Sequence, residues 1–288
     1  MEVNDLLLLA KIRGLDYQDL LLKSDFAKVN PIERDLLADF KRRIARGYPM
    51  AYLLGKIKFA EREFQVSDNV LIPRPETEDW VNFLSADLSR NLQESNFQSL
   101  NILEVGTGSG VIGLTLTLNL DKYINEVLLT DISNKAIRIC VQNTEDLVVD
   151  TKLRSKINFQ RSDLLERLGG VKFINGRLSN KTNQFNLLVA NLPYLPDNDR
   201  KLPAFRNLKY EPGIALYAGY DGLNLFRKLI QQIFQKNYSF NEMWFELDPR
   251  NIHSAKEYVS FVLPDYETAI LEDFNHFDRV LVVKKSSD

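Results

Sequence analysis

The sequence predicts an α/β protein in which a helical N-terminal part precedes a parallel, doubly wound sheet. From residue 100 onward, short apolar runs alternate with helical stretches, an order typical of parallel strands joined by crossover helices on both faces of a sheet. In the first third of the chain, apolar residues instead recur at helical spacing. The length of 288 residues is typical of two domains.

The composition is that of an ordinary globular protein, with 44% hydrophobic and 26% charged residues. The 37 lysines and arginines nearly balance 39 aspartates and glutamates, so no strong net charge attracts the chain to nucleic acid or membranes. One cysteine excludes an internal disulfide and a multi-cysteine zinc site, and two histidines leave little for a histidine metal centre. Because there is no long apolar run and the leucine-rich start is short and acidic, we expect a soluble, cytoplasmic, metal-free protein.

The N-terminal part contains one clearly delimited helix. Apolar residues recur at helical spacing from Ile32 to Ile44, with charged residues between them. Asn30 can cap this helix, and Glu33 completes a capping-box pattern with it. Gly47 then ends the helix.

A joint between two domains follows this helix. Two short apolar segments, at 57–59 and 63–66, predict a β-hairpin that leads into residues 70–72. A long helix through Trp80 and Leu84 comes next. We therefore expect two domains, with residues 1–73 forming a helical domain plus the hairpin and residues 74–288 forming the larger domain.

Six apolar runs beyond residue 100 are predicted to be the strands of the sheet. They are Asn101–Val105, Glu126–Thr130, Ile157–Gln160, Phe185–Ala190, Met243–Leu247 and Arg279–Val283. The stretch from Gly169 to Gln184 is rich in Gly, Asn, Ser and Lys without periodicity, and it is expected to be an exposed, mobile loop.

A glycine-rich turn joins the first of these strands to an apolar helix. The turn reads Gly106-Thr107-Gly108-Ser109-Gly110 and is followed by Val111. Closely spaced glycines at a strand-to-helix turn let the backbone approach a ligand and direct amide groups at it. A dinucleotide-binding turn would have glycine where this chain has Val111. A nicotinamide dehydrogenase is therefore excluded.

Acidic residues follow the next two strands. Asp131 comes after the second strand, where a carboxylate can accept hydrogen bonds from both hydroxyls of a ribose. Asp163 follows the third strand, within reach of an adenine amino group, and Leu164 can pack on the base. The turn and the two acids together predict an adenosine site.

These residues resemble the cofactor site of class I S-adenosylmethionine-dependent methyltransferases. The resemblance lies in Glu104-x-Gly106-x-Gly108-x-Gly110, Asp131 and Asp163. It implies a Rossmann-like class I methyltransferase domain with a mostly parallel, seven-stranded sheet, and S-adenosyl-L-methionine as the cofactor. The cofactor-binding residues that it implies are Gly106, Thr107, Gly108, Ser109, Gly110, Asp131, Asp163, Leu164 and Asn191.

The fourth strand ends in Asn191-Leu192-Pro193-Tyr194, which resembles the tetrapeptide that methylates planar nitrogens in this superfamily. The lone pair of such a nitrogen is delocalised, so the nitrogen must be held in line with the sulfonium methyl group. The side-chain oxygen of Asn191 and the carbonyl of Leu192 can accept its two N–H bonds. Pro193 biases Leu192 away from the helical region, and Tyr194 can stack on the planar group. All four are candidate catalytic and substrate-binding residues, and no strong general base is required.

Three further stretches resemble the glutamine methyltransferases of peptide chain release factors. Residues 71–78, Leu-Ile-Pro-Arg-Pro-Glu-Thr-Glu, resemble the signature of that family, and residues 48–55 and 210–223 match stretches before and after it. The resemblance implies that the helical domain recognises the release factor and the larger domain methylates the glutamine of its Gly-Gly-Gln motif. It also implies that Arg74 and Glu76 shape the substrate pocket. Release factors are the expected partners of a monomer that binds neither nucleic acid stably nor membranes.

Two departures from the family pattern leave the substrate open. Leu192 stands where the tetrapeptide normally has proline, and this spelling is closer to the adenine dimethyltransferases of ribosomal RNA. The family's Glu-Ile-Gly-x-x-Gln appears only as Glu-Leu-Asp-Pro-Arg-Asn at residues 246–251. One alternative is methylation of an exocyclic adenine amino group in RNA or DNA, which the near-neutral charge disfavours. The other is a non-catalytic protein that binds a cofactor or a partner, which the intact Asn191 and Tyr194 disfavour.

Overall fold

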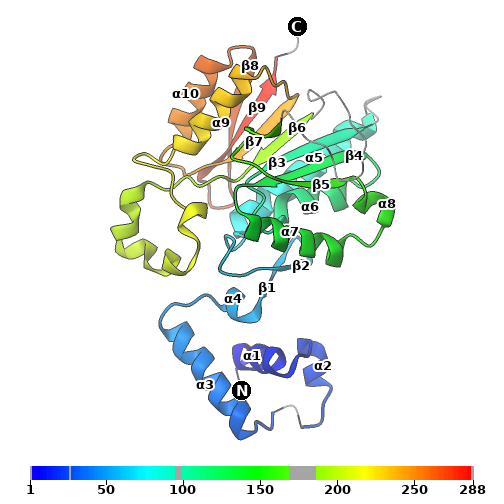
Figure 1. Ribbon diagram of the computed structural model, residues 1–288, viewed down its shortest axis with the longest axis vertical. Coiled ribbons are helices and arrows are strands. Elements are labelled where there is room, and N and C mark those ends of the chain that lie inside the picture. The colour runs from blue at the N-terminus through cyan, green and yellow to red at the C-terminus, as the bar shows by residue number, and fades with distance from the viewer. Residues whose placement is uncertain (1, 26, 95–98, 169–185, 287–288) are drawn as a thin grey trace.

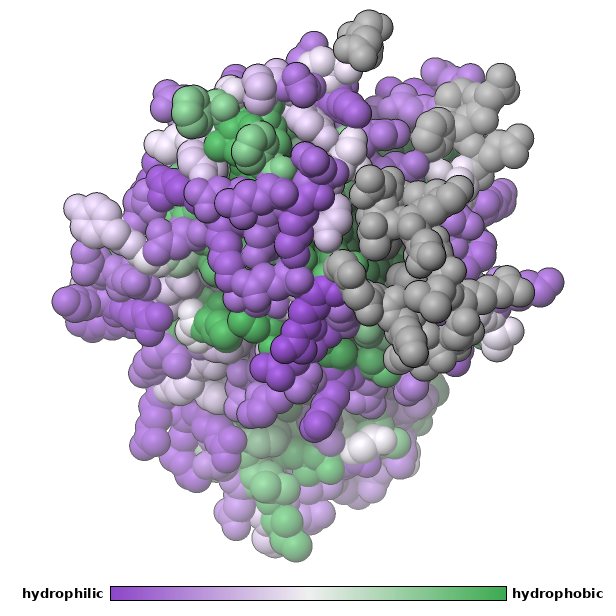
Figure 2. Space-filling model, turned by 45° about the horizontal axis from the view of Figure 1, so that its top comes forward, coloured by the Kyte–Doolittle hydropathy of each residue, from purple (hydrophilic) through white to green (hydrophobic). Residues whose placement is uncertain are grey.

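A computed structural model describes residues 2–25, 27–94, 99–168 and 186–286. Figure 1 shows the N-terminal helices at one end of the molecule and a sheet flanked by helices in the larger part. The loop predicted from Gly169 to Gln184 lies outside the described residues. Figure 2 shows that hydrophilic side chains cover most of one face of the molecule, with smaller hydrophobic groups between them.

The larger part is built on one sheet with the strand order β5-β4-β3-β6-β7-β9-β8. The first five strands in this order pair in parallel, and β9 is antiparallel to both β7 and β8. The predicted fold, a doubly wound and mostly parallel sheet, is therefore confirmed. The strands are β3 (Leu100–Val105), β4 (Ile124–Asp131), β5 (Ile157–Arg161), β6 (Leu187–Ala190), β7 (Glu242–Glu246), β8 (Tyr266–Glu272) and β9 (Asp278–Lys285).

The strand β8 is the one that the search for apolar runs does not predict. It lies at the edge of the sheet beside β9, and its side chains are half-buried or exposed along its whole length. Antiparallel edge strands with one wet face alternate polar and apolar residues instead of forming a continuous apolar run. The central strand β3 is the opposite case, because all six of its residues are buried.

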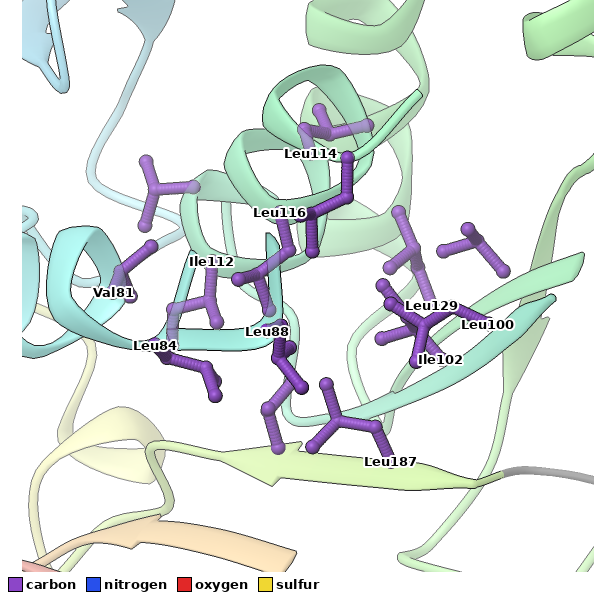
Figure 3. Close-up of a cluster of buried hydrophobic side chains, with 14 of the residues drawn as sticks. Val81, Leu84, Leu88, Leu100, Ile102, Ile112, Leu114, Leu116, Leu129 and Leu187 are labelled. Atoms are coloured by element: carbon purple, nitrogen blue, oxygen red, sulfur yellow. The ribbon is translucent and has the colours of Figure 1, made fainter. Parts of the chain in front are cut away.

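Helices cover both faces of the sheet, because successive residues of a strand point to opposite sides. Ile102 of β3 packs into a core with α5 and α6, and the next residue, Leu103, packs into a second core with α9 and α10. Figure 3 shows the first core, where Leu84 of α5 and Ile112 of α6 approach the strands. The helices are α5 (Pro75–Glu94), α6 (Val111–Asn119), α7 (Asn134–Leu147), α8 (Thr151–Arg154), α9 (Asn224–Gln235) and α10 (Ile252–Val262).

The N-terminal helices have a hydrophobic core of their own. The helices are α1 (Val3–Arg13), α2 (Tyr17–Leu21), α3 (Pro31–Ala45) and α4 (Met50–Leu54). Leu9 and Leu20 are fully buried between them. The predicted capping box is present, because Asn30 Oδ1 accepts from the amide of Glu33 at 2.9 Å and Glu33 Oε2 accepts from the amide of Asn30 at 2.9 Å.

The predicted hairpin is also present, as β1 (Lys56–Phe59) and β2 (Arg62–Gln65). Its aromatic residues Phe59 and Phe64 are buried in the same core as α5 and α6. The hairpin therefore packs against the larger part of the molecule. A domain boundary at residues 73 and 74 stays a prediction.

A second connection joins the N-terminal helices to the segment between β6 and α9. This segment contains three short 3-10 helices, η2 (Asp197–Lys201), η3 (Pro203–Tyr210) and η4 (Gly213–Ala215). At the end of η3, the Tyr210 hydroxyl donates to the carbonyl of Arg46 at 3.1 Å, and its ring lies 5.1 Å from that of Tyr48. The next residue, Glu211, is buried.

Glu211 ties this segment to the start of α5. Its two carboxylate oxygens accept from the amide of Ile72 at 3.0 Å and from Nη2 of Arg74 at 2.5 Å. Glu211 is more than a hundred positions away from both Ile72 and Arg74 in the chain. Glu211 therefore fixes the path of the chain where it enters α5.

Among the helices that the structure describes, none is long and apolar enough to cross a membrane.

We expect Glu211→Gln to lower the free energy of unfolding by about 1–3 kcal/mol, because a buried charge-assisted hydrogen bond is lost. Urea denaturation would measure the change. The matched control is Asp197→Asn, an exposed carboxylate whose pair with Arg200 is 4.0 Å long, and its effect should stay within about 0.5 kcal/mol. Equal effects of the two substitutions would contradict the role assigned to Glu211.

Candidate active site

The glycine-rich turn lies where β3 ends and α6 begins. Gly106, Gly108 and Gly110 have φ angles of 78°, 54° and 84°, in the left-handed region that favours glycine. A Cβ atom at Gly110 would also lie 2.6 Å from Sγ of the buried Cys140. At Gly108, by contrast, an added Cβ would meet no atom within 4 Å. The turn is therefore packed on its inner side and open at Gly108.

A buried carboxylate holds this turn from inside the sheet. Glu104, in β3, is 1% exposed, and its Oε2 accepts from the Thr107 hydroxyl at 2.7 Å and from the amide of Gly113 at 3.1 Å. Burial raises the pKa of Glu104 to about 8, and the two donors act in the opposite direction. Glu104 thus connects the strand, the turn and the first part of α6.

Asp131 lies at the end of the neighbouring strand β4, facing the turn. One carboxylate oxygen accepts from the amide of Gly108 at 3.0 Å and the other accepts from the amide of Ser133 at 2.8 Å. Burial raises the pKa of Asp131, while these amide hydrogen bonds lower it. An ionised carboxylate offers about four acceptor positions, so two amide donors leave capacity for a ligand.

Asp163 and Leu164 follow β5, as predicted. Asp163 Oδ2 forms an ion pair with Nζ of Lys228 at 2.6 Å, a partner from α9 that the sequence did not reveal. Leu164 is buried and has a φ of 51°. Both residues line the same cavity as the glycine-rich turn.

The turn, the acids and the tetrapeptide line one cavity of about 460 Å³. This volume is within the usual range of small-molecule sites. The structure therefore brings together all the residues that were predicted to bind the cofactor, apart from Gly110, which closes the turn behind the cavity. The residues that line this cavity include Thr77, Gly106, Thr107, Gly108, Ser109, Asp131, Asp163, Leu164, Asn191, Leu192, Pro193 and Lys228.

The tetrapeptide begins directly after β6. The amide nitrogen Nδ2 of Asn191 donates to the hydroxyl of Thr77 at 3.3 Å. Its oxygen, Oδ1, is buried and receives no hydrogen bond from the residues that the structure describes. The side chain of Leu192 is buried and would contact a Cβ atom at Gly106. Asn191 thus lines the cavity and carries an unpartnered acceptor, whereas the Leu192 side chain packs against the turn.

Tyr194 is held at both its backbone and its hydroxyl. Its carbonyl accepts from Nδ2 of Asn251 at 3.0 Å, and a Cβ atom at Gly222 would lie 2.0 Å from that carbonyl oxygen. Its hydroxyl donates to Oε1 of Glu246 at 3.2 Å. Burial raises the pKa of Tyr194, with the Glu246 charge adding to the shift, so the hydroxyl keeps its proton at neutral pH.

A second cavity, of about 270 Å³, is lined by two residues of the tetrapeptide, Asn191 and Tyr194. It includes Asn191, Leu71 and Ala215, which also line the first cavity. Arg74 lines the second cavity, and its predicted role in shaping the substrate pocket stays a prediction. Glu76 is not among the residues described along either cavity, and its predicted role in the pocket stays a prediction. The other residues that line the second cavity include Tyr194, Phe205, Leu208, Asp248 and Arg279.

The sequence reasoning missed three residues of this site. Thr77 lies in the stretch that resembled the family signature, and Glu246 and Asn251 lie in the stretch noted only for its departure from the family pattern. One signal in the sequence could have identified Glu246. The residue ends β7, and ligands bind at the carboxyl ends of the strands in open α/β sheets. Among the described residues, no cluster of three or more His, Cys, Asp or Glu could hold a metal ion.

Comparison with protein families and curated proteins points to methyltransferases. A family model described as lysine methyltransferase matches residues 78–169. The release factor glutamine methyltransferase of Bacillus subtilis is 32% identical over 256 residues, which cover 87% of this chain and 81% of that protein. That of Deinococcus radiodurans is 31% identical over 250 residues, covering 87% of this chain and 80% of that protein. That of Lactococcus lactis is 27% identical over 257 residues, covering 89% and 85%.

Solved structures share the fold at low sequence identity. The hMettl16 catalytic domain in complex with a MAT2A 3'UTR hairpin has a TM-score of 0.56 and 12% identity, covering 96% of this chain and 95% of that chain. The N-terminal domain of human METTL16 in complex with SAH has a TM-score of 0.50 and 14% identity, covering 96% and 97%. This likeness confirms the predicted Rossmann-like class I methyltransferase fold.

The raised pKa of Glu104 predicts a pH-dependent stability. Between about pH 4.5 and about pH 8 the folded state binds more protons than the unfolded state. The free energy of unfolding should therefore fall as the pH rises through this window, by up to about 1.4 kcal/mol per pH unit. The free energy of unfolding, measured by urea denaturation at several pH values in this window, should depend less steeply on pH in Glu104→Gln, because glutamine does not titrate. Identical slopes for the parent and the variant would contradict the raised pKa.

Proposed function

This chain belongs to the release factor glutamine methyltransferase family, and on that premise we propose that Asn191 holds the reacting glutamine between the two cavities. The protein is an S-adenosylmethionine-dependent methyltransferase that acts on release factor glutamine. The proposal extends this activity to individual residues. It assigns the cofactor to the 460 Å³ cavity and the glutamine side chain to the 270 Å³ cavity.

The residues of the larger cavity suit S-adenosylmethionine. The carboxylate of Asp131 keeps acceptor capacity beyond its two amide hydrogen bonds, which suits the two ribose hydroxyls. Asp163 has a second carboxylate oxygen besides the one that pairs with Lys228, and this oxygen suits the adenine amino group. Leu164 offers an apolar surface for the base, and the open side of Gly108 admits a ligand close to the backbone.

The observation that carries the proposal is the unpartnered Oδ1 of Asn191. A buried amide oxygen without a hydrogen bond costs free energy, and none of the described residues satisfies this one. Asn191 lines both cavities, and a donor that reached this oxygen from the smaller cavity would satisfy it. A glutamine side-chain amide has two N–H donors on one nitrogen and fits this requirement.

The chemistry needs alignment more than a strong base. When bound, S-adenosylmethionine supplies a methyl group on a positively charged sulfur. Asn191 Oδ1 and the Leu192 carbonyl accept the two N–H bonds of the glutamine and orient its nitrogen toward the first cavity. Tyr194, fixed by Glu246 and Asn251, lines the smaller cavity beside the planar amide. These residues would hold the nitrogen in place while its lone pair becomes available. The new N–C bond would replace the S–C bond of the cofactor, S-adenosylhomocysteine would leave, and the methylated nitrogen would release one proton to solvent.

The remaining parts of the proposal concern partners. We propose that the glutamine is that of the Gly-Gly-Gln motif and that the N-terminal helices contact the release factor. We also propose that the protein acts as a monomer in the cytoplasm, without a stable nucleic-acid partner. The near balance of 37 basic and 39 acidic residues supports the last point, because nucleic-acid binding depends on concentrated positive charge.

An assay with labelled S-adenosylmethionine, offering a release factor, ribosomal RNA and DNA side by side, tests the function. We expect label on the release factor. Asn191→Ala should lower the rate by about 10²–10³-fold, because a preorganised acceptor at the reacting nitrogen is lost. Asn91→Ala, which changes an exposed residue of α5, should keep the parent rate. Label on RNA alone would favour the adenine alternative and refute the proposal.

The assignment of Asp131 predicts a loss of cofactor affinity. Asp131→Ala should remove one or two charge-assisted hydrogen bonds to the ribose, at about 1.5–3 kcal/mol each. The Kd for S-adenosylmethionine, measured by calorimetry, should therefore rise at least about tenfold. The control Asp121→Ala changes an exposed carboxylate that does not line the cavity and should leave the Kd unchanged. An unaltered Kd in Asp131→Ala would refute the assignment.

A further inference from the structure

Glu246 accepts hydrogen bonds from three side chains, of which Thr77 lines the larger cavity and Tyr194 the smaller one. The residue ends β7 and is 1% exposed. Its Oε2 accepts from the Thr77 hydroxyl at 2.7 Å and from Nε1 of Trp80 at 2.8 Å, both in α5. Its Oε1 accepts from the Tyr194 hydroxyl at 3.2 Å. One carboxylate therefore links the start of α5 with the tetrapeptide.

The distances decide where the hydroxyl proton of Thr77 points. A hydroxyl has one proton, and Thr77 Oγ1 lies 2.7 Å from Glu246 Oε2 but 3.3 Å from Asn191 Nδ2. A short hydrogen bond to a carboxylate is stronger than a longer one to a neutral amide. Burial raises the pKa of Glu246, whereas its hydrogen bonds from Trp80 and Thr77 favour the ionised form. With Glu246 ionised, the proton goes to Glu246, and Thr77 Oγ1 is left as an acceptor.

This acceptor fixes the orientation of the Asn191 amide. Only the NH₂ group of an asparagine can donate to Thr77 Oγ1, because the amide oxygen is an acceptor. With Nδ2 turned toward Thr77, Oδ1 must point the other way, and it is the oxygen that stays unpartnered among the described residues. The two ends of the amide are nearly equal in size, so packing alone distinguishes them poorly.

We propose that Glu246 and Thr77 are positioning residues for methyl transfer, which act by holding the Asn191 amide with its oxygen toward the substrate. The inference rests on the proposed role of Asn191. If the amide turned over, its NH₂ group would face the NH₂ group of the glutamine, and two donors cannot form a hydrogen bond with each other. Thr77 and Glu246 themselves do not touch the reacting nitrogen. They determine which end of Asn191 does.

The same carboxylate also sets the position of Tyr194. Trp80 Nε1 can only donate, so it occupies one acceptor position of Oε2 beside Thr77. Oε1 then remains for the hydroxyl of Tyr194. The first and last residues of the tetrapeptide are therefore both oriented by one buried group, Asn191 through Thr77 and Tyr194 directly.

The test compares a substitution that is isosteric with threonine with one that keeps only its hydroxyl function. Thr77→Val keeps the shape and removes the hydroxyl, whereas Thr77→Ser keeps the hydroxyl. We expect Thr77→Val to lower kcat for methylation of a release factor by about tenfold to a hundredfold. KM and the cofactor Kd should stay within about threefold of the parent. Thr77→Ser should stay within about threefold in kcat. A loss in Thr77→Ser equal to that in Thr77→Val, or full kcat in Thr77→Val, would overturn the proposal.

A double-mutant cycle separates positioning from a general effect on the fold. If Thr77 acts through Asn191, Thr77→Val should cause no further loss of kcat in the Asn191→Ala background. An additional loss as large as in the parent background would overturn the inference. Thr77→Ala repeats the comparison if Thr77→Val folds poorly, as judged by its thermal midpoint. A parent enzyme that leaves release factors unmethylated would refute the proposed function itself, which distinguishes that failure from failure of the positioning role.

Discussion

Burying a carboxyl group requires hydrogen-bond partners around it, because a buried polar group without a partner costs free energy. Glu104 and Glu246 are both 1% exposed and lie near the carboxyl ends of β3 and β7. The donors that surround Glu104 come from the glycine-rich turn and α6. Those that surround Glu246 come from α5 and the tetrapeptide. The proposed cofactor and substrate positions thus each depend on one buried acid, and the geometry of the site follows from satisfying both.

The sequence predicts those parts of the site whose signals are local. The capping box at Asn30 and Glu33 lies within four residues, and the glycine-rich turn and the tetrapeptide each occupy a few consecutive positions after a strand. Such patterns carry their own geometry, because turn and cap conformations depend on neighbouring residues. The class I fold, the cavity and the family could therefore be anticipated from the sequence.

Contacts between distant residues could not be predicted in the same way. Thr77 and Glu246 are 169 positions apart, and Asp163 and Lys228 are 65 apart. No periodicity or spacing connects such pairs, so they become visible only when the sheet brings the strand ends together. The edge strand β8 was missed for a different reason, since its half-exposed residues form no apolar run. Local pattern thus identifies the pieces of the site, whereas the fold determines their partners.

The close approach of Gly222 to the carbonyl of Tyr194 has a consequence for protein design. A Cβ atom at this glycine would lie 2.0 Å from that oxygen and 2.9 Å from Nδ2 of Asn251, and its φ is 79°. The carbonyl of Tyr194 thus packs directly against the backbone of Gly222, where there is no room for a side chain. An attempt to adapt the tetrapeptide to a larger nucleophile would have to move this loop with it. The two segments form a single design unit, although Tyr194 and Gly222 are 28 positions apart in the chain.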